Sequence, residues 1–273
     1  MKNIFIYISI FIFIFIPTID ANNEKINPFL KQHEALNKQI NKINYSFITE
    51  IDNEVYFFPN DLNIVALGDS LTQGVGDESA NEGYVGLLEA DLDNNVIIEN
   101  YGIAGYRSDQ LLELLNEPNV VASLTKADIV LITIGANDML KVFKRDFTNL
   151  KTEPFLTELK QFENRLKDIF TTIHQTNANS NIYLIGFYDP FSTYFPEIEE
   201  LSYIYTQWTD KSKVVTDSFD YTYFIPTNDL FKEDIKPFLA DDNFHPNQAG
   251  YQKISSQIIN YIKSGIGDAY DRD

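Results

Sequence analysis

Short apolar runs alternate with longer amphipathic segments along residues 63–262 of this 273-residue chain. The runs are rich in Ile, Val and Leu, and several of them end at a glycine. Continuous apolar runs of this size predict strands that are buried on both faces of a parallel sheet. The five runs are Ile64–Leu67, Val96–Ile98, Ile129–Ile134, Ile182–Ile185 and Tyr221–Ile225.

Helical patterns fill the segments between these runs. They cover Tyr84–Leu92, Ser108–Leu115, Leu156–Ile173 and Gln248–Ile262. The alternation of strand and helix predicts an α/β fold with a central parallel sheet. In such sheets, sites form where the carboxyl ends of the strands meet. We therefore expect the chemistry of this protein in the residues that directly follow the apolar runs.

The N-terminal segment has a different pattern. Ile4–Ile16 is almost entirely apolar and follows Lys2. It is shorter than the ~20 residues that cross a bilayer as a helix and has the length of a signal-peptide core. We expect residues 1–21 to be a signal peptide or a retained membrane anchor, because Ala21 suits a cleavage site but Ile19 is larger than the signal prefers. A buried core helix or strand is the alternative interpretation.

The remaining organisation follows from composition. Residues 22–60 are polar and rich in Asn, Lys and Gln, which is typical of a stalk or linker. No repeat and no Pro/Gly/Ser-rich stretch interrupts the patterned region, so we expect one domain over residues 61–265 and a short tail over 266–273. With an exported N-terminus, this domain is expected outside the cytoplasm, either secreted or anchored to the outer face of the cytoplasmic membrane.

Composition and charge exclude several classes of function. The chain is 44% hydrophobic and 14% aromatic, which allows a sizeable core and excludes global disorder. Its net charge of −19 repels phosphate backbones, so we expect no nucleic-acid partner. The absence of cysteine excludes disulfides, Cys-based zinc sites and a Cys nucleophile. Any histidine chemistry must use His33, His174 or His245.

The first candidate segment, 68–74, follows the first apolar run and reads Gly-Asp-Ser-Leu-Thr-Gln-Gly. A serine on a strand-to-helix turn can expose its hydroxyl at the sheet edge, beside the positive end of a helix. Ser70 is therefore a candidate nucleophile. An ordinary turn with a helix cap is the alternative. A phosphate-binding loop is a third interpretation, but no Lys-Ser/Thr pair follows the glycines.

Two further segments follow the second and third apolar runs. Segment 100–105 has small residues that let a ligand approach the backbone closely. Segment 135–138 reads Gly-Ala-Asn-Asp, and the amide of Asn137 can donate to a developing oxyanion. Both segments also have the composition of common turns.

The fourth candidate segment precedes the last helical pattern. Pro246 favours an extended conformation at His245, and Asn247 can cap the following helix. Asp242 lies three residues before His245 and can turn back to the imidazole, where it would select the tautomer. A solvated loop histidine is the alternative. His174 ends a long helical pattern, where a cation suits the helix dipole.

Together and in this order, the segments resemble the blocks of the SGNH, or GDSL, hydrolase superfamily, and especially its bacterial exported lipase/acylhydrolase branch. The resemblance covers residues 64–262. It implies a three-layer α/β/α sandwich, flavodoxin-like, with a five-stranded parallel sheet. It also implies that Ser70 is the nucleophile, His245 the general base and Asp242 its orienting partner. The oxyanion hole would combine the backbone N–H groups of Ser70 and Gly105 with the Asn137 side chain, and no metal or cofactor would be needed.

Two acidic residues flank these positions. We expect Asp69 and Asp138 to brace the loops through backbone hydrogen bonds and not to react. The aromatic-rich segment 187–208 could wall an acyl chain or stack on a sugar, while ordinary packing is the alternative.

The function that these observations favour is a serine esterase or acylhydrolase with an acyl-enzyme on Ser70. Its substrate would be a lipid or acyl ester, or an O-acetylated glycan, and the membrane would be contacted only through the N-terminal segment. A catalytically silent, membrane-tethered binding protein with the same fold is the alternative. A nucleotide-binding α/β protein is disfavoured by the missing P-loop lysine and the acidic surface.

Overall fold

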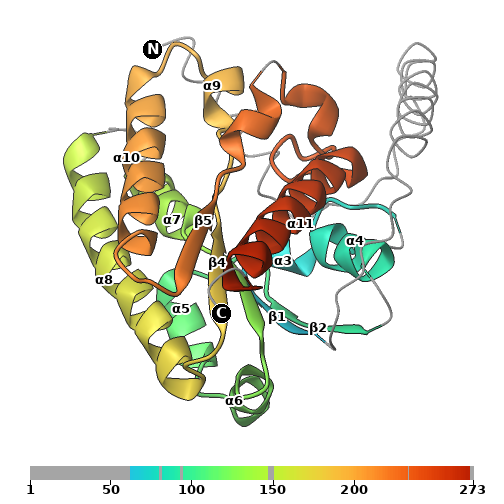
Figure 1. The fold of residues 1–273 in the computed structure, drawn as a ribbon. Coiled ribbons are helices and arrows are strands. Elements are labelled where there is room, and N and C mark those ends of the chain that lie inside the picture. Colours follow the sequence, from blue (N-terminus) through green and yellow to red (C-terminus); the bar gives the residue numbers. More distant parts are fainter. Residues whose placement is uncertain (1–61, 80–81, 93–94, 147–150, 233, 271–273) are drawn as a thin grey trace.

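The computed structural model describes residues 62–79, 82–92, 95–146, 151–232 and 234–270 (Figure 1). The signal or anchor segment expected at 1–21 and the stalk expected at 22–60 lie outside these residues and stay predictions. No helix within the described ranges has the length and apolar character needed to cross a membrane.

Five strands form one parallel sheet in the order β2-β1-β3-β4-β5. They all occur at the positions of the predicted apolar runs, as β1 (Leu62–Gly68), β2 (Val96–Gly102), β3 (Ile129–Thr133), β4 (Asn181–Ile185) and β5 (Thr222–Ile225). In this register Gly68 lies opposite both Gly102 and Thr133. Three carboxyl ends therefore align at one edge of the sheet, which confirms the predicted parallel sheet.

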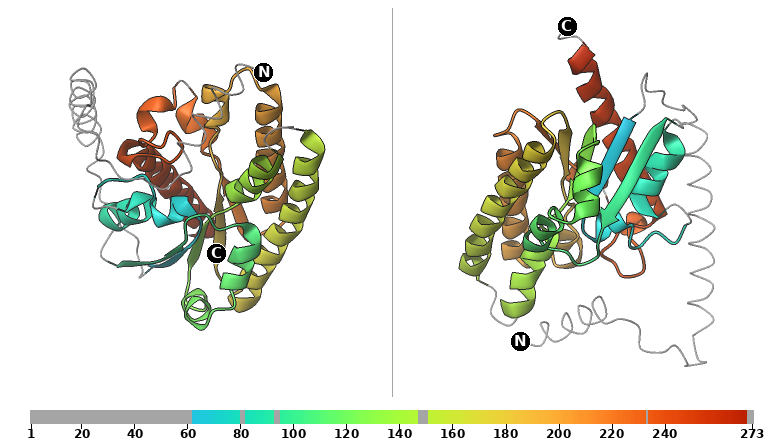
Figure 2. Two further views of the ribbon diagram at one scale, coloured as in Figure 1. Left: turned by 180° about the vertical axis from the view of Figure 1, so that it is seen from behind. Right: turned by 90° about the horizontal axis from the view of Figure 1, so that it is seen from below.

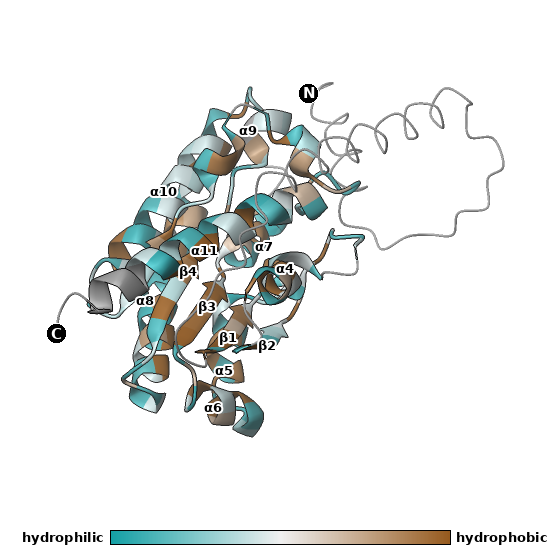
Figure 3. Cartoon of the chain, turned by 45° about the vertical axis from the view of Figure 1, so that its right-hand side comes forward, coloured by the Kyte–Doolittle hydropathy of each residue, from teal (hydrophilic) through white to brown (hydrophobic). Residues whose placement is uncertain are grey.

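Alternating side chains of each strand enter two separate cores. Val65 and Leu67 of β1 face one core, whereas Ile64 and Ala66 face the other. The same alternation holds in β3 and β4, because both faces of a central strand are covered by helices. Figure 3 shows the resulting hydrophobic colour along the strands.

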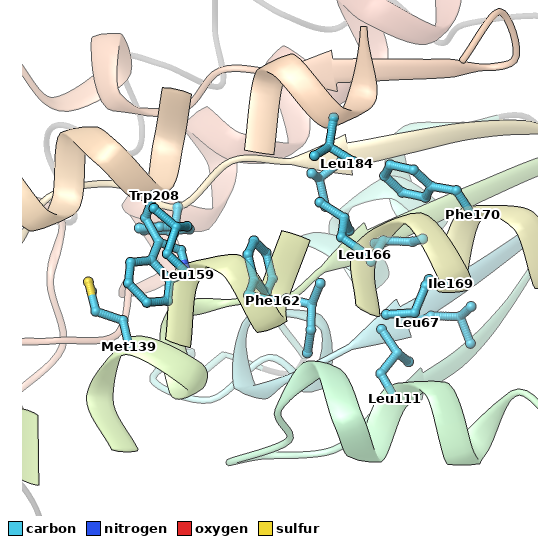
Figure 4. Close-up of a cluster of buried hydrophobic side chains, with 14 of the residues drawn as sticks. Leu67, Leu111, Met139, Leu159, Phe162, Leu166, Ile169, Phe170, Leu184 and Trp208 are labelled. Carbon is cyan, nitrogen blue, oxygen red and sulfur yellow. The ribbon is translucent and has the colours of Figure 1, made fainter. Parts of the chain in front are cut away.

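Helices cover both faces of the sheet and complete the predicted three-layer sandwich (Figures 1 and 2). One face carries α5 (Ser108–Leu114), α6 (Pro118–Leu124), α7 (Ala136–Asp146), α8 (Thr152–Thr176) and α10 (Glu199–Thr216). The opposite face carries α4 (Gly83–Asp91) and α11 (Gln248–Tyr270). Figure 4 shows part of the first core, where Phe162 and Leu166 of α8 lie with Leu67 and Leu184 of the sheet.

The four predicted helical patterns correspond to α4, α5, α8 and α11, and α11 continues into the expected tail as far as Tyr270. Three helices, α6, α7 and α10, add to the predicted set. Of these, α7 begins inside the Gly-Ala-Asn-Asp segment and ends with Lys144 and Arg145 in its last turn, where cations favour a helix. The short elements α3 (Ser70–Gln73), α9 (Phe191–Tyr194), η2 (Asn228–Phe231) and η3 (Lys236–Phe238) lie in the connections.

Candidate active site

The predicted site residues converge at the carboxyl edge of the sheet. Ser70 begins α3 directly after β1, Gly105 follows β2, and Asn137 lies in the first turn of α7 after β3. His245 comes from the loop between η3 and α11. These four residues line one cleft, and Asp242 stands behind His245.

A hydrogen-bonded chain joins serine, histidine and aspartate. The Ser70 Oγ lies 2.9 Å from Nε2 of His245, and Nδ1 of the same ring lies 2.5 Å from Oδ2 of Asp242. The other carboxylate oxygen of Asp242 accepts from the backbone N–H groups of Phe244 and His245, both at 2.9 Å. The carboxylate is thus held by both oxygens, and it holds the imidazole in the orientation that presents Nε2 to Ser70.

The charge state of Asp242 suits this arrangement. Burial acts to raise the pKa of Asp242, but the hydrogen bond and charge of His245 and two backbone N–H groups outweigh it and hold the pKa below its ordinary value. The carboxylate therefore stays ionised, and it can stabilise an imidazolium at His245.

The turn that presents Ser70 depends on a glycine and an aspartate. Gly68 has φ +146°, and a Cβ there would lie 2.3 Å from the carbonyl oxygen of Thr133. Asp69 then caps α3 by accepting a hydrogen bond from the Leu71 N–H at 3.1 Å. This confirms the expected bracing role of Asp69, and it leaves the Ser70 N–H in the first turn of the helix, where a backbone N–H has no partner within the helix.

Three hydrogen bonds fix the loop around Gly105, which has φ +81°. The Ile103 N–H donates to the carbonyl of Gly68 at 3.0 Å, and the Ala104 N–H donates to the side chain of Gln73 at 2.6 Å. Asn137 Nδ2 donates one hydrogen to the Tyr106 carbonyl at 3.0 Å. The amide keeps a second hydrogen for a ligand, so the Asn137 amide joins the backbone of Ser70 and Gly105 at the same cleft.

Comparisons with known proteins identify the family of this chain. Residues 66–253 match the model of the GDSL-like Lipase/Acylhydrolase family. The chain belongs to this family. Membership identifies it as a carboxylic ester hydrolase, and the match spans all the segments that carry the predicted site.

Individual relatives of this family member are bacterial or metagenomic. The uncharacterized protein YpmR of Bacillus subtilis is 33% identical over 73% of this chain and 81% of its own length. The spore germination lipase LipC of Bacillus licheniformis is 28% identical over 72% of this chain and 94% of its own. The crystal structure of a lipase from a goat-rumen metagenome has a TM-score of 0.66 at 26% identity and covers 73% of this chain and 96% of that one.

The cleft of this GDSL-family hydrolase has a volume of about 200 Å³ and is mostly apolar away from Ser70. Its apolar wall comprises Val75, Met139, Leu140, Phe187, Pro190, Phe191 and Phe244. Two polar side chains of the wall are already engaged: the Tyr188 hydroxyl donates to the Phe244 carbonyl at 2.5 Å, and Asp69 accepts from Leu71 and Thr133. Lys144 also lines the cleft, two turns along α7 from Asn137.

The aromatic segment 187–208 divides between the two interpretations. Phe187, Tyr188 and Phe191 line the cleft. In contrast, Tyr205 and Trp208 of α10 are buried in the core and serve ordinary packing. Periodicity alone could not separate the two groups, because both are aromatic and both are buried.

His174 and Asp138 take the expected places. His174 lies in the last turn of α8 and stacks on Tyr221 with ring centroids 3.7 Å apart, far from the chemistry. His33 lies outside the described residues. Asp138 accepts the backbone N–H of Ser108 at 3.0 Å, as the expected bracing role requires. Among the described residues, no group of His, Asp and Glu side chains is arranged to hold a metal ion.

Several contacts of the site carry no signal in the sequence. Gln73 and Tyr188 shape the cleft through hydrogen bonds to the backbone of Ala104 and Phe244. Arg165 reaches Asp138 from the middle of α8. Each contact joins segments that are distant in the chain, so neither spacing nor composition could have revealed it.

Asp69 gives a pH-dependent prediction. Its complete burial raises its pKa from the ordinary 3.8 to about 6, although hydrogen bonds from Leu71 and Thr133 oppose the rise. Between the unfolded and folded pKa values the folded state holds more protons than the unfolded state. The contribution of Asp69 to stability is therefore full below pH ~4 and is lost as pH rises through about 6.

We expect Asp69→Asn to remove this dependence, because an amide oxygen can accept the same two hydrogen bonds without titrating. From pH 5 to pH 8, the free energy of unfolding of the wild type should fall by about 1–2 kcal/mol relative to the variant. Urea unfolding of both proteins across this range measures the difference. Parallel curves would show that Asp69 is already ionised at pH 5.

Proposed function

We propose that this hydrolase is a serine esterase for apolar acyl esters and that it works through an acyl-enzyme on Ser70. The observation that carries the proposal is the 2.9 Å contact between Ser70 Oγ and His245 Nε2, backed by Asp242, at the mouth of an apolar cleft.

In the first half-reaction, Ser70 Oγ attacks the ester carbonyl carbon while its proton passes to Nε2 of His245. Asp242 stabilises the imidazolium that forms. The oxyanion receives hydrogen bonds from the N–H groups of Ser70 and Gly105 and from the Asn137 amide, each of which acts mainly in the transition state. The carbon–oxygen bond to the leaving alcohol then breaks as His245 returns the proton to that oxygen.

In the second half-reaction, water attacks the acyl-enzyme while His245 accepts a proton from it. Collapse of the intermediate breaks the bond to Ser70 Oγ, which recovers its proton, and the acid is released. A serine-directed fluorophosphonate tests the assignment of the nucleophile: peptide mapping should find the label on Ser70 and on no other serine. A folded protein that takes no label would favour the silent binding protein instead.

The lining of the cleft supports an acyl chain over an O-acetylated glycan. Sugar hydroxyls need buried partners, and each one left without a partner costs about 1–3 kcal/mol. The cleft offers apolar side chains from α7 and from segment 187–191, and its Tyr188 hydroxyl is committed to the backbone. An aliphatic chain gains free energy from the same surface with every methylene that enters it.

A series of p-nitrophenyl esters tests this preference. Each methylene that the cleft buries contributes about 0.8 kcal/mol, so kcat/KM should rise about fourfold per methylene until the cleft is full and then level off. O-acetylated xylooligosaccharides should be hydrolysed no faster than p-nitrophenyl acetate. A kcat/KM that does not change with chain length, together with rapid deacetylation of the glycan, would show that the substrate is an O-acetylated glycan and not an acyl ester.

A matched pair of variants localises the effect. Phe191 lines the cleft, whereas Phe219 is half-buried and packs against Phe170 at the edge of the core. Phe191→Ala should flatten the dependence on chain length, while Phe219→Ala should leave the slope unchanged. The slope of log kcat/KM against chain length does not depend on the fraction of folded enzyme. It therefore distinguishes an effect on the cleft from a general loss of stability.

A further inference from the structure

A buried ionic network lies directly behind the oxyanion side of the site. Asp138 has no solvent-exposed side-chain surface, and its Oδ1 lies 3.0 Å from Nη2 of Arg165. The same nitrogen lies 2.6 Å from Oε1 of Glu158, which precedes Arg165 by two turns on α8. Ser108 completes the network: its Oγ donates to Asp138 Oδ1 and accepts from Arg165 Nε, both at 2.6 Å.

Each end of this network is joined to a group that faces the cleft. Asp138 is the next residue after Asn137 in the first turn of α7. Ser108 begins α5 directly after the loop that carries Gly105 and Tyr106. The Tyr106 carbonyl accepts the hydrogen bond that orients the Asn137 amide. A shift of Ser108 relative to Asp138 would therefore change the positions of both Gly105 and Asn137.

We propose that Arg165 is a positioning residue for ester hydrolysis, because its guanidinium ties Asp138 and Ser108 together and so sets the distance between the Asn137 amide and the Gly105 N–H. This role rests on the proposed function, in which those two groups bind the oxyanion. Arg165 itself does not line the cleft and touches no reacting atom.

Physical chemistry favours this role over stability alone. Two carboxylates share one guanidinium here, and buried ion pairs of this kind contribute little net stability compared with apolar packing. Burial raises the pKa of Asp138, while the hydrogen bonds from Ser108 and the charge of Arg165 oppose the rise. The charge-assisted bonds are directional, which suits them to fixing two loops at one separation.

Kinetics of Arg165→Met on a p-nitrophenyl ester test the proposal. A donor displaced by about 1 Å costs up to about 10² in rate, so kcat should fall about 10–100-fold while KM stays within about threefold. Arg165→Lys should recover part of the lost kcat, because lysine restores the positive charge but not the several N–H donors of the planar guanidinium. Lys167→Met is the matched control: Lys167 lies on the same helix and pairs with Glu163 at 2.7 Å, away from the site, so its kcat should not change.

A double-mutant cycle identifies the group through which Arg165 acts. In an Asn137→Ala background, Arg165→Met should lower kcat by a clearly smaller factor than in the wild type, because one of the two groups whose separation it sets is gone. Equal losses with and without Asn137 would overturn the proposal, as would a loss expressed only in KM. Where Arg165→Met does not fold, Ser108→Ala removes the hydroxyl that bridges Asp138 and Arg165, and the same criteria apply.

The wild-type enzyme separates the two levels of inference. If the wild type hydrolyses esters through Ser70 but folded Arg165→Met keeps its full kcat, only the positioning role is overturned. If the wild type shows no Ser70-dependent hydrolysis, the proposed function fails and the positioning role fails with it.

Discussion

Replacing Ser70 with alanine is expected to lower kcat/KM for p-nitrophenyl butyrate by about 10⁵–10⁶-fold. The nucleophile is lost, and the remaining oxyanion donors give only residual catalysis by bound water. The fold should survive, because the Ser70 hydroxyl contacts His245 and the turn is held instead by Gly68 and Asp69. Steady-state hydrolysis, circular dichroism and fluorophosphonate labelling measure the three effects on one preparation.

Ser255→Ala is the matched control for this experiment. Ser255 is also a buried serine, but it lies on α11, and its hydroxyl has no hydrogen-bond partner in the described structure. Its loss should change neither activity nor labelling. Hydrolysis by Ser70→Ala within about tenfold of wild type, a barrier change of only about 1.4 kcal/mol, would refute Ser70 as the nucleophile once contaminating esterase is excluded.

Replacing Asp242 with asparagine should reduce kcat by up to about 10⁴-fold with little change in KM. The Asp242 Oδ1 accepts two backbone N–H groups, so the amide oxygen of the variant will take that place. The amide NH₂ then faces Nδ1 of His245, where the native structure has Oδ2. A donor at that position requires an unprotonated Nδ1, which moves the proton to Nε2 and prevents His245 from accepting the proton of Ser70.

Asp241→Asn supplies the neighbouring control. Asp241 is exposed, and its backbone carbonyl accepts a hydrogen bond from the Asn243 side chain at 3.3 Å, a contact that the substitution leaves in place. Its kcat should stay within about twofold of wild type. A severe effect of Asp241→Asn with a mild effect of Asp242→Asn would reverse the assignment of the third residue, and mild effects of both would leave a Ser–His pair as the catalytic unit.

The apolar pattern of the sequence predicted a central parallel sheet and the positions of all five strands, and the resemblance to the SGNH hydrolases implied the three layers. Buried parallel strands are continuous apolar runs, and this is a local property that no distant contact needs to supply. The same locality explains why Ser70, Gly105 and Asn137 could be identified as site candidates: each lies within a few residues after the end of a strand, and carboxyl ends of parallel strands share one edge. The pairing of Asp242 with His245 is also local, since they are three positions apart in the chain.

Only the tertiary structure decided which of these candidates meet and what surrounds them. His245 reaches Ser70 across 175 residues of chain, and that contact depends on the strand order β2-β1-β3-β4-β5 and on how the last loop crosses the sheet edge. The apolar wall of the cleft combines α7 with segment 187–191, and the Arg165 network joins α5, α7 and α8. Such contacts arise when elements distant in the chain pack against one another, so residue type and spacing do not predict them. Strands and turns can be predicted because they follow from interactions between near neighbours in the chain.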